Sequence, residues 1–247
     1  MRELDRELPR LVLRRAGREL RRTRSLLGPP RSVRAYLDTH GVRKLQLGAG
    51  PTELPGWLNT DRDPGTRQAV YLDVTRRFPL PNASFDYILS EHQIEHLSYR
   101  NGLFMLRECL RVLRPGGRVR IATPDLATIA GLAAHELSDD QRRYVRWTIE
   151  TFVPEAPRDL PAFTINNAFR NWGHRFLYDE PTLAHALRSA GFTDIRRHTV
   201  GESEDESLRG LESHGVLDGD GAMIRFETMV LEAARRTSST AIADADV

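Results

Sequence analysis

The sequence predicts an α/β fold built on a doubly wound, mostly parallel sheet of seven strands. After Gly41, short apolar runs that end in Gly or Asp alternate with longer segments of helical periodicity, which is the pattern of βαβ units. The 247 residues are 40% hydrophobic and 28% charged, so the chain is long enough for a sizeable core and is not a disordered protein by composition.

A basic segment precedes this pattern. Residues 1–34 hold eleven Arg against four acidic side chains, a net +7, whereas the whole chain carries only +2. Apolar residues recur there at helical spacing until Gly28-Pro29-Pro30, so we expect residues 1–41 to form a basic amphipathic helical arm. Such an arm packs on its own domain, binds a partner protein or makes a peripheral contact with an anionic membrane surface. It has no aromatic residue before Tyr36, and we expect no nucleic-acid partner.

Five strands and one helix make up the first part of the predicted domain. The helix covers 101–113, where leucines recur on one face, and Pro115-Gly116-Gly117 turns the chain into the next strand. The predicted strands are 44–47, 57–60, 69–72, 85–89 and 118–123.

Residues 124–178 interrupt the alternation and predict an inserted lid or acceptor-binding segment. A helical stretch near 139–151 leads into a Pro-punctuated connection rich in asparagine, tryptophan and histidine. Amides beside an aromatic ring suit contacts with a sugar, so we predict that Asn167, Asn171 and Trp172 bind substrate. The alternative is a structural cap in which these amides satisfy backbone groups.

The remaining elements complete the sheet. A helix over 181–190, capped by Asp179 and ended by Gly191, precedes predicted strands at 195–200 and 222–231. The domain therefore covers 42–234, and the Ser/Thr/Ala/Asp-rich residues 235–247 are expected to be a disordered tail.

Three consecutive strand ends carry the residues expected at a nucleoside-binding site. The first strand runs into Gly48-Ala49-Gly50, the second ends in Asp61, and the third is followed by Asp73. Glycines permit close approach of the backbone to a ligand, and a carboxylate at a strand end can accept hydrogen bonds from ribose hydroxyls. Glu53 occupies the place of the third glycine of a dinucleotide motif, which disfavours a nicotinamide cofactor. The predicted cofactor-binding residues are Leu47, Gly48, Ala49, Gly50, Asp61, Asp73, Val74 and Ser90.

These motifs resemble those of the class I S-adenosylmethionine-dependent methyltransferases, in particular methyltransferase type 11. The resemblance implies a Rossmann-like fold and S-adenosyl-L-methionine as cofactor. It also implies that Gly48 and Gly50 approach the amino-acid part, Asp61 holds the ribose and Asp73 contacts adenine. The segment 51–56 is shorter than the helix that the family commonly has there. The shared stretches lie between residues 42 and 234: Leu45 to Gly50, Trp57 to Asp61, Asp73, Phe78 to Pro81, Ser84 to Asp86, Leu113 to Gly117 and Ser189 to Phe192.

The densest polar cluster, residues 90–96, follows the fourth strand. Its His92-x-x-Glu95-His96 matches the inverted zinc-peptidase motif, but the strand context and the lack of a clear third ligand argue against a peptidase. A similar loop in ubiquinone-biosynthesis O-methyltransferases, Glu-x-x-Glu-His, binds a divalent metal. Because His92 replaces the first Glu, a hard cation is disfavoured, and we predict no metal ligands.

The resulting hypothesis is methyl transfer to a hydroxyl of a small metabolite or saccharide. His92 and His174 are the candidate general bases, because an unperturbed histidine titrates near neutral pH. An N-methyltransferase and a non-catalytic binding module are the alternatives. No apolar run reaches the roughly 18–20 residues that span a bilayer, and no leader pattern is present, so a cytoplasmic protein is expected. The single cysteine, Cys109, is expected to be buried.

Overall fold

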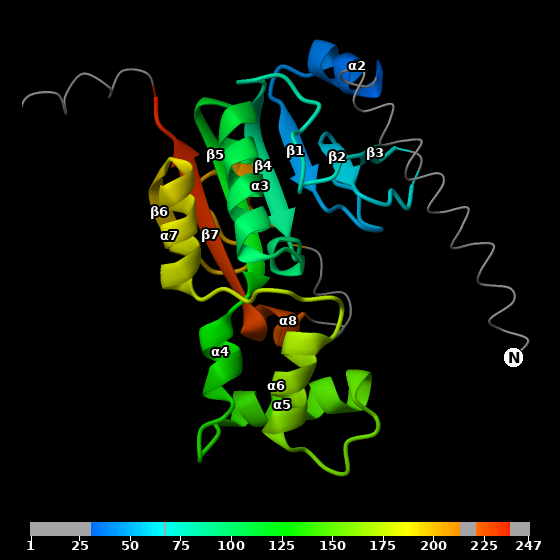
Figure 1. Cartoon of the computed structure of the whole chain (residues 1–247), viewed down its shortest axis with the longest axis vertical. Coiled ribbons are helices and arrows are strands. Elements are labelled where there is room, and N and C mark those ends of the chain that lie inside the picture. Colours follow the sequence, from blue (N-terminus) through cyan, green and yellow to red (C-terminus); the bar gives the residue numbers. More distant parts are fainter. Residues whose placement is uncertain (1–30, 67, 213–220, 238–247) are drawn as a thin grey trace, which may run out of the picture.

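A seven-stranded sheet organises the computed structural model, which describes residues 31–66, 68–212 and 221–237 (Figure 1). The strand order is β3-β2-β1-β4-β5-β7-β6, and only β7 runs antiparallel to its neighbours. The predicted doubly wound, mostly parallel sheet is therefore confirmed. The strands are β1 (Lys44–Leu47), β2 (Leu58–Asp61), β3 (Val70–Tyr71), β4 (Phe85–Glu91), β5 (Leu113–Pro124), β6 (Phe192–His198) and β7 (Thr228–Arg235).

Three strands differ from the predicted ones by three or more residues at one end or both. β5 begins at Leu113, which pairs with Phe85, so the expected turn at 115–117 lies inside the strand beside a register irregularity. β6 begins at Phe192, three residues before the predicted start at Ile195. The strand predicted over 222–231 was wrong in its first half, because Ala222–Glu227 forms helix α8 and β7 starts only at Thr228.

Helices α3 (Tyr99–Val112) and α7 (Glu180–Ala190) lie together on one face of the sheet (Figure 1). Side chains mark both starts: the Ser98 hydroxyl accepts the Asn101 N–H, and the Asp179 carboxylate accepts the Thr182 N–H. Between these helices and the sheet lies the main apolar core, which includes Leu45, Leu47, Phe85, Ile88, Met105, Leu106, Val119, Leu183 and Leu187. Cys109 is buried in it, as expected.

Part of the predicted arm is joined to the sheet. Helix α2 (Arg31–Thr39) buries Val33, Tyr36 and Leu37 in the main core. The Tyr36 hydroxyl accepts the N–H of Lys44, the first residue of β1, at 2.8 Å. The rest of the arm, residues 1–30, lies outside the described residues, as do residues 238–247 of the predicted tail. No helix of the described segments is long and apolar enough to cross a membrane.

The lid is a helical lobe beyond the carboxyl ends of the parallel strands (Figure 1). It comprises α4 (Leu126–Gly131), α5 (Asp139–Phe152) and α6 (Pro161–Arg170), and α8 packs against it. Of these helices only α5 was predicted. The lobe has a core of its own, built from Ile129, Leu132, Tyr144, Val145, Ile149, Ala168 and Leu177.

Backbone hydrogen bonds tie both ends of the lid to the sheet. The Asp125 N–H donates to the Glu227 carbonyl at 2.7 Å, and the Leu126 N–H donates to the Tyr178 carbonyl at 2.8 Å. Arg197 of β6 adds an ion pair to Asp125 at 2.9 Å. The chain therefore enters and leaves the lid beside β5, which fixes the lobe over the ends of β4 and β5.

A buried charge network joins two central strands to the loop that follows β6. The fully buried Arg120 of β5 donates to Glu232 of β7 at 2.6 Å, to Glu212 at 2.5 Å and to the Glu202 carbonyl at 2.8 Å. Glu212 also accepts the Gly201 N–H at 2.8 Å. This network anchors the loop 199–212 to the sheet.

Candidate active site

The glycine turn lies where β1 ends, in the middle of the sheet. Gly48 and Gly50 have φ angles of +67° and +54°, which favour glycine. The Ala49 N–H between them donates to the Thr60 carbonyl of β2 at 3.0 Å. A Cβ added to Gly48 would lie 2.2 Å from Oε1 of Gln93, so the loop after β4 closely approaches this turn.

The two predicted nucleoside carboxylates follow adjacent strands. Asp61 accepts the Gly50 N–H at 3.0 Å through Oδ2 and the Asp63 N–H at 2.6 Å through Oδ1. Asp73 accepts the backbone N–H and the hydroxyl of Thr75, at 3.0 and 2.6 Å. Asp61 is therefore bonded to the glycine turn, whereas Asp73 closes a turn of its own.

Further predicted cofactor residues surround the turn. Ser90 of β4 pairs with Leu47 in the sheet, and its buried hydroxyl oxygen has no hydrogen-bond partner among the residues that the structure describes. Leu47, Ala49 and Val74 are buried. The segment 51–56 contains no helix, in agreement with its short length. A turn open to a ligand, with an unpaired hydroxyl beside it, fits a polar cofactor.

A cavity of about 280 Å³ lies between the ends of β4 and β5 and the lid. Aromatic rings from α5 and from the connection after α6 form much of its wall, and histidines and carboxylates from the sheet side form the rest. The lining residues are His92, Glu95, His96, Pro124, Tyr144, Trp147, Thr148, Phe152, Trp172, His174, Ile224 and Glu227.

Glu95 is the most buried polar residue of this cavity. Its side chain has no exposed surface, and its Oε2 accepts the Thr123 hydroxyl at 3.1 Å. Its backbone carbonyl accepts the N–H groups of Arg175 and Phe176, at 2.8 and 3.2 Å. These two bonds bring the end of the lid, with His174, against the loop after β4.

His92, a predicted base, has both ring nitrogens close to a partner. Nδ1 lies 3.3 Å from Glu95 Oε1, and Nε2 lies 3.2 Å from the Thr228 hydroxyl. Burial lowers the pKa of His92, but the hydrogen bond and charge of Glu95 outweigh it and raise the pKa overall. Burial raises the pKa of Glu95, but the hydrogen bond and charge of His92 outweigh burial and lower this pKa overall. Glu95 is therefore held as a carboxylate.

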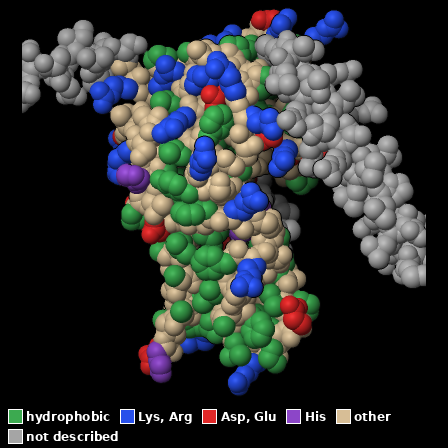
Figure 2. Space-filling model, in the orientation of Figure 1, with side chains coloured by type: hydrophobic (Ala, Val, Ile, Leu, Met, Phe, Trp, Pro, Cys, Tyr) green, Lys and Arg blue, Asp and Glu red, His purple; other side chains and the backbone are tan. Residues whose placement is uncertain are grey.

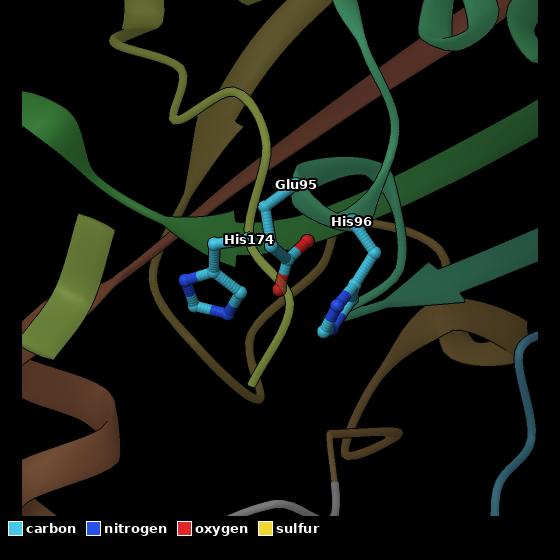
Figure 3. A group of neighbouring side chains, drawn as sticks. All are labelled: Glu95, His96 and His174. Carbon is cyan, nitrogen blue, oxygen red and sulfur yellow. The ribbon is translucent and has the colours of Figure 1, made fainter. Parts of the chain in front are cut away.

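His174, the other predicted base, lies beside His96, which sequence reasoning did not single out (Figure 3). Nδ1 of His174 lies 2.7 Å from the Ala168 carbonyl, so Nδ1 carries the proton and Nε2 keeps its lone pair. The His96 ring is hydrogen-bonded to the Trp172 carbonyl, and burial lowers the pKa of His96. One donor atom from each of Glu95, His96 and His174 lies within 4.8 Å of the others.

The predicted substrate residues fall into two places. Trp172 lines the cavity, is 46% exposed and packs edge-to-face on Phe152 with ring centres 4.9 Å apart. Asn167 and Asn171 line a neighbouring hollow of about 340 Å³, and the Asn171 amide donates to the Asn167 side chain at 2.8 Å. Phe152 borders both spaces. The two amides line only the neighbouring hollow, so the structure does not place them in the histidine-lined cavity.

Two further cavity residues were missed by the sequence analysis. The Tyr144 hydroxyl of α5 donates to Glu227, which lies at the end of α8. Burial, followed by the charge of Glu227, raises the pKa of Tyr144 well above its ordinary value. Because residues 222–227 were expected to form a strand, no sequence pattern placed Glu227 beside the lid.

Comparison with known proteins agrees with this architecture. Residues 55–121, from the β1–β2 connection into β5, match the family described as a methyltransferase domain. No curated protein sequence matches the chain.

Similar solved structures are distant in sequence. One, a SAM-dependent methyltransferase from Archaeoglobus fulgidus, is 16% identical with a TM-score of 0.46, covering 88% of this chain and 94% of its own. Another, an S-adenosylmethionine-dependent methyltransferase from Mesorhizobium loti, has the same identity and TM-score, and the match covers 83% of this chain and 96% of that protein. A phosphoethanolamine N-methyltransferase 2 from Haemonchus contortus, in complex with S-adenosyl-L-methionine, is 15% identical with a TM-score of 0.42, over 80% of this chain. The present chain spans about half of the length of that protein. Residues 55–121 therefore match a methyltransferase domain, and they lie in a sheet whose strand order and reversed seventh strand give a Rossmann-like, doubly wound fold.

Proposed function

We propose that this protein transfers the methyl group of S-adenosylmethionine to a hydroxyl oxygen of a small metabolite or saccharide held in the cavity beneath the lid. One observation carries the proposal: the loop after β4 serves two neighbouring places. Gln93 lies against the glycine turn, whereas Glu95 and His96 line the cavity. A donor in the first place and an acceptor in the second would therefore meet across a single short loop.

The chain's own residues suit the cofactor. In this proposal the backbone of 48–50 receives its amino-acid part, Asp61 the ribose and Asp73 the adenine. The unpaired Ser90 hydroxyl is a further polar contact, and Leu47, Ala49 and Val74 supply apolar walls. When bound, the cofactor supplies a methyl group on a positively charged sulfur.

The protein's part in the reaction is alignment and proton removal. Methyl transfer is an in-line displacement, for which ideal positioning supplies on the order of 7–11 kcal/mol. An acceptor hydroxyl must also lose its proton as the new bond forms. The cluster of Glu95, His96 and His174 is a group of titratable side chains in the cavity wall, and it is suited to promote that loss. His92, engaged through both ring nitrogens, instead positions Glu95.

The aromatic walls bear on the acceptor. Trp147, Phe152 and Trp172 present flat apolar faces or edges, and the carboxylates and imidazoles present hydrogen-bonding groups. Such a mixture suits a ring that bears hydroxyls, with apolar C–H faces for the aromatic residues and oxygens for the polar ones.

Calorimetric titration with S-adenosylhomocysteine tests the cofactor assignment. Hydrogen bonds to a charged group contribute about 1.5–3 kcal/mol, so Asp61→Ala should weaken binding roughly 10- to 100-fold. Asp63→Ala is the matched control, because Asp63 is exposed on the same turn and contributes its backbone N–H, which the substitution retains. Wild-type protein that does not bind the ligand would refute the proposed activity, and unchanged affinity in Asp61→Ala would refute the ribose assignment.

A screen of hydroxyl-bearing metabolites and saccharides, read by mass spectrometry, tests the acceptor class. The expected product carries one additional methyl group on oxygen. A product methylated on nitrogen, formed at comparable rate in His174→Ala, would contradict the hydroxyl assignment.

A further inference from the structure

We propose that Glu95, His96 and His174 form a binding site for a divalent transition-metal ion of the zinc type. One donor atom from each residue lies within 4.8 Å of the other two, and the three side chains point toward a common space at the cavity (Figure 3). Two imidazoles and one carboxylate are a common protein ligand set for zinc, which leaves a fourth position for another ligand. Here that position would face the cavity.

Both imidazoles are already oriented as metal ligands are. Metal-bound histidines almost always donate their other ring N–H to a carbonyl, a carboxylate or water, which fixes the tautomer. His174 Nδ1 bonds to the Ala168 carbonyl at 2.7 Å, and the His96 ring bonds to the Trp172 carbonyl. His174 therefore has Nδ1 held by the backbone and Nε2 left for a ligand.

The carboxylate provides an independent observation. Glu95 is fully buried, and among the described residues its Oε1 has only the long contact with the His92 ring. Its charged neighbour there is His92 Nδ1 at 3.3 Å, which is longer than the roughly 2.7–2.9 Å of a strong charge-assisted hydrogen bond. Burying an incompletely paired carboxylate is costly, and coordination of a cation would offset that cost.

The second layer around the carboxylate is also in place. Thr123 donates to Oε2, and His92, which contacts Thr228 through its other nitrogen, lies against Oε1. Hydrogen bonds from Arg175 and Phe176 to the Glu95 carbonyl hold the His174 segment against the loop after β4. The site is therefore preorganised by contacts that do not depend on the ion.

The donor set determines the class of ion. Imidazole nitrogens suit zinc, cobalt and nickel, whereas magnesium and calcium require mostly oxygen ligands. In the cavity, and resting on the proposed methyl transfer, the ion would lower the pKa of the acceptor hydroxyl, whose proton would pass to solvent.

Titration of the metal-stripped full-length chain with Co²⁺ alone, followed by visible absorption, tests the site. We expect the absorption of a Co²⁺ ion with nitrogen ligands, and its displacement by equimolar Zn²⁺. Even partners in the second layer contribute about 10- to 100-fold to metal affinity, so His174→Ala and His96→Ala should each weaken binding by roughly 100-fold or more. His185 is an exposed histidine on α7, so His185→Ala is the matched control and should bind Co²⁺ as the wild type does.

No change in absorption with Co²⁺, or equal affinity in His174→Ala and the wild type, would overturn the proposal. S-adenosylhomocysteine titration of the same samples checks that each variant is folded and tests the methyltransferase proposal separately. If the protein binds S-adenosylhomocysteine but no metal ion, only the proposal of a metal site is refuted. Binding of metal without the nucleoside removes the proposed methyl transfer and leaves the site standing.

Discussion

Gly48 and Gly50 share a left-handed backbone but differ in their surroundings. A Cβ on Gly50 or on Gly41 would have no neighbour within 4 Å, whereas a Cβ on Gly48 would overlap Gln93 Oε1. Gly50→Ala should therefore lose about 1–2 kcal/mol of unfolding free energy from backbone strain alone. Gly48→Ala should lose more, and Gly41→Ala should be nearly neutral. Urea unfolding monitored by circular dichroism measures all three.

The double variant Gly48→Ala/Gln93→Ala isolates the contact. Because Gln93 would then end at Cβ, the loss should fall toward that of Gly50→Ala. If Gln93→Ala brings no recovery, the contact between the turn and the loop does not limit the residue at position 48.

The sequence could predict that the proposed cofactor residues share one edge of the sheet, because most of them lie at or just after the end of a strand. Once the strands ending near Leu47 and Asp61 were recognised, the parallel sheet placed their ends at one edge. The cavity residues offered no such rule. His174 meets Glu95 only because the lid folds back and Arg175 and Phe176 bond to the Glu95 carbonyl, a contact between distant segments. Glu95 and His96 were visible as a motif and His174 as a separate candidate base, but no sequence pattern placed His174 beside the motif.

At the scale of elements, helix α3 clamps the loop before β4. Arg111 donates to the carbonyls of Phe78 and Leu80 at 3.0 and 2.9 Å and pairs with Glu108 at 2.6 Å, while Glu108 accepts the Phe78 N–H at 2.7 Å. Burial raises the pKa of Glu108, but the bonds from Arg111 and Phe78 outweigh it and lower the pKa below 4.5.

This lowered pKa gives a signed pH dependence. A carboxyl group with a depressed pKa in the folded state stabilises fully above its unfolded pKa, and that contribution disappears as pH falls through the folded value. We expect Glu108→Gln to be less stable than wild type at pH 7, with the difference shrinking below about pH 4.5. Urea unfolding across this pH range measures the difference. Arg107→Ala, exposed on the same helix, should show no comparable change, and a constant difference for Glu108→Gln would contradict the clamp.

The elements missed by sequence reasoning have specific causes. Pro161 looked like a break in the chain but occupies the first turn of α6, where proline is favoured because its missing N–H has no helical partner. The apolar run from Ala222 to Leu231 looked like one strand, yet it divides into α8 and β7 at Thr228. Phe226 of α8 packs against Tyr144 in the core of the lid, and this contact between distant segments cannot be read from the local sequence.

At the scale of the whole molecule, Arg120 connects the sheet with the loop 199–212. Its removal would leave Glu212 without the cation it pairs with, and Glu232 with only the longer contacts to Arg118 at 3.9 Å and His198 at 3.4 Å. Breaking a buried pair typically costs about 3–5 kcal/mol. We expect a loss of that size in Arg120→Met by urea unfolding. Arg196→Ala, which breaks exposed pairs with Asp194 and Glu204, is the control and should change stability little.

A compensating variant distinguishes the charge from the packing. Arg120→Met/Glu212→Gln/Glu232→Gln removes both carboxylates with the cation and should recover part of the lost stability. If the triple variant is no more stable than Arg120→Met, the loss comes from packing and not from unpaired charge.

The short loop after β4, with Gln93 against the glycine turn and Glu95 and His96 at the cavity, joins the proposed cofactor site to the proposed metal site. A ligand that orders the loop from one side changes the work of ordering it from the other, and linkage requires the two effects to be equal. The factor by which Zn²⁺ alters the affinity for S-adenosylhomocysteine must then equal the factor by which S-adenosylhomocysteine alters the affinity for Zn²⁺. A factor other than one would show that a metal ion bound beneath the lid changes the affinity of the protein for the cofactor.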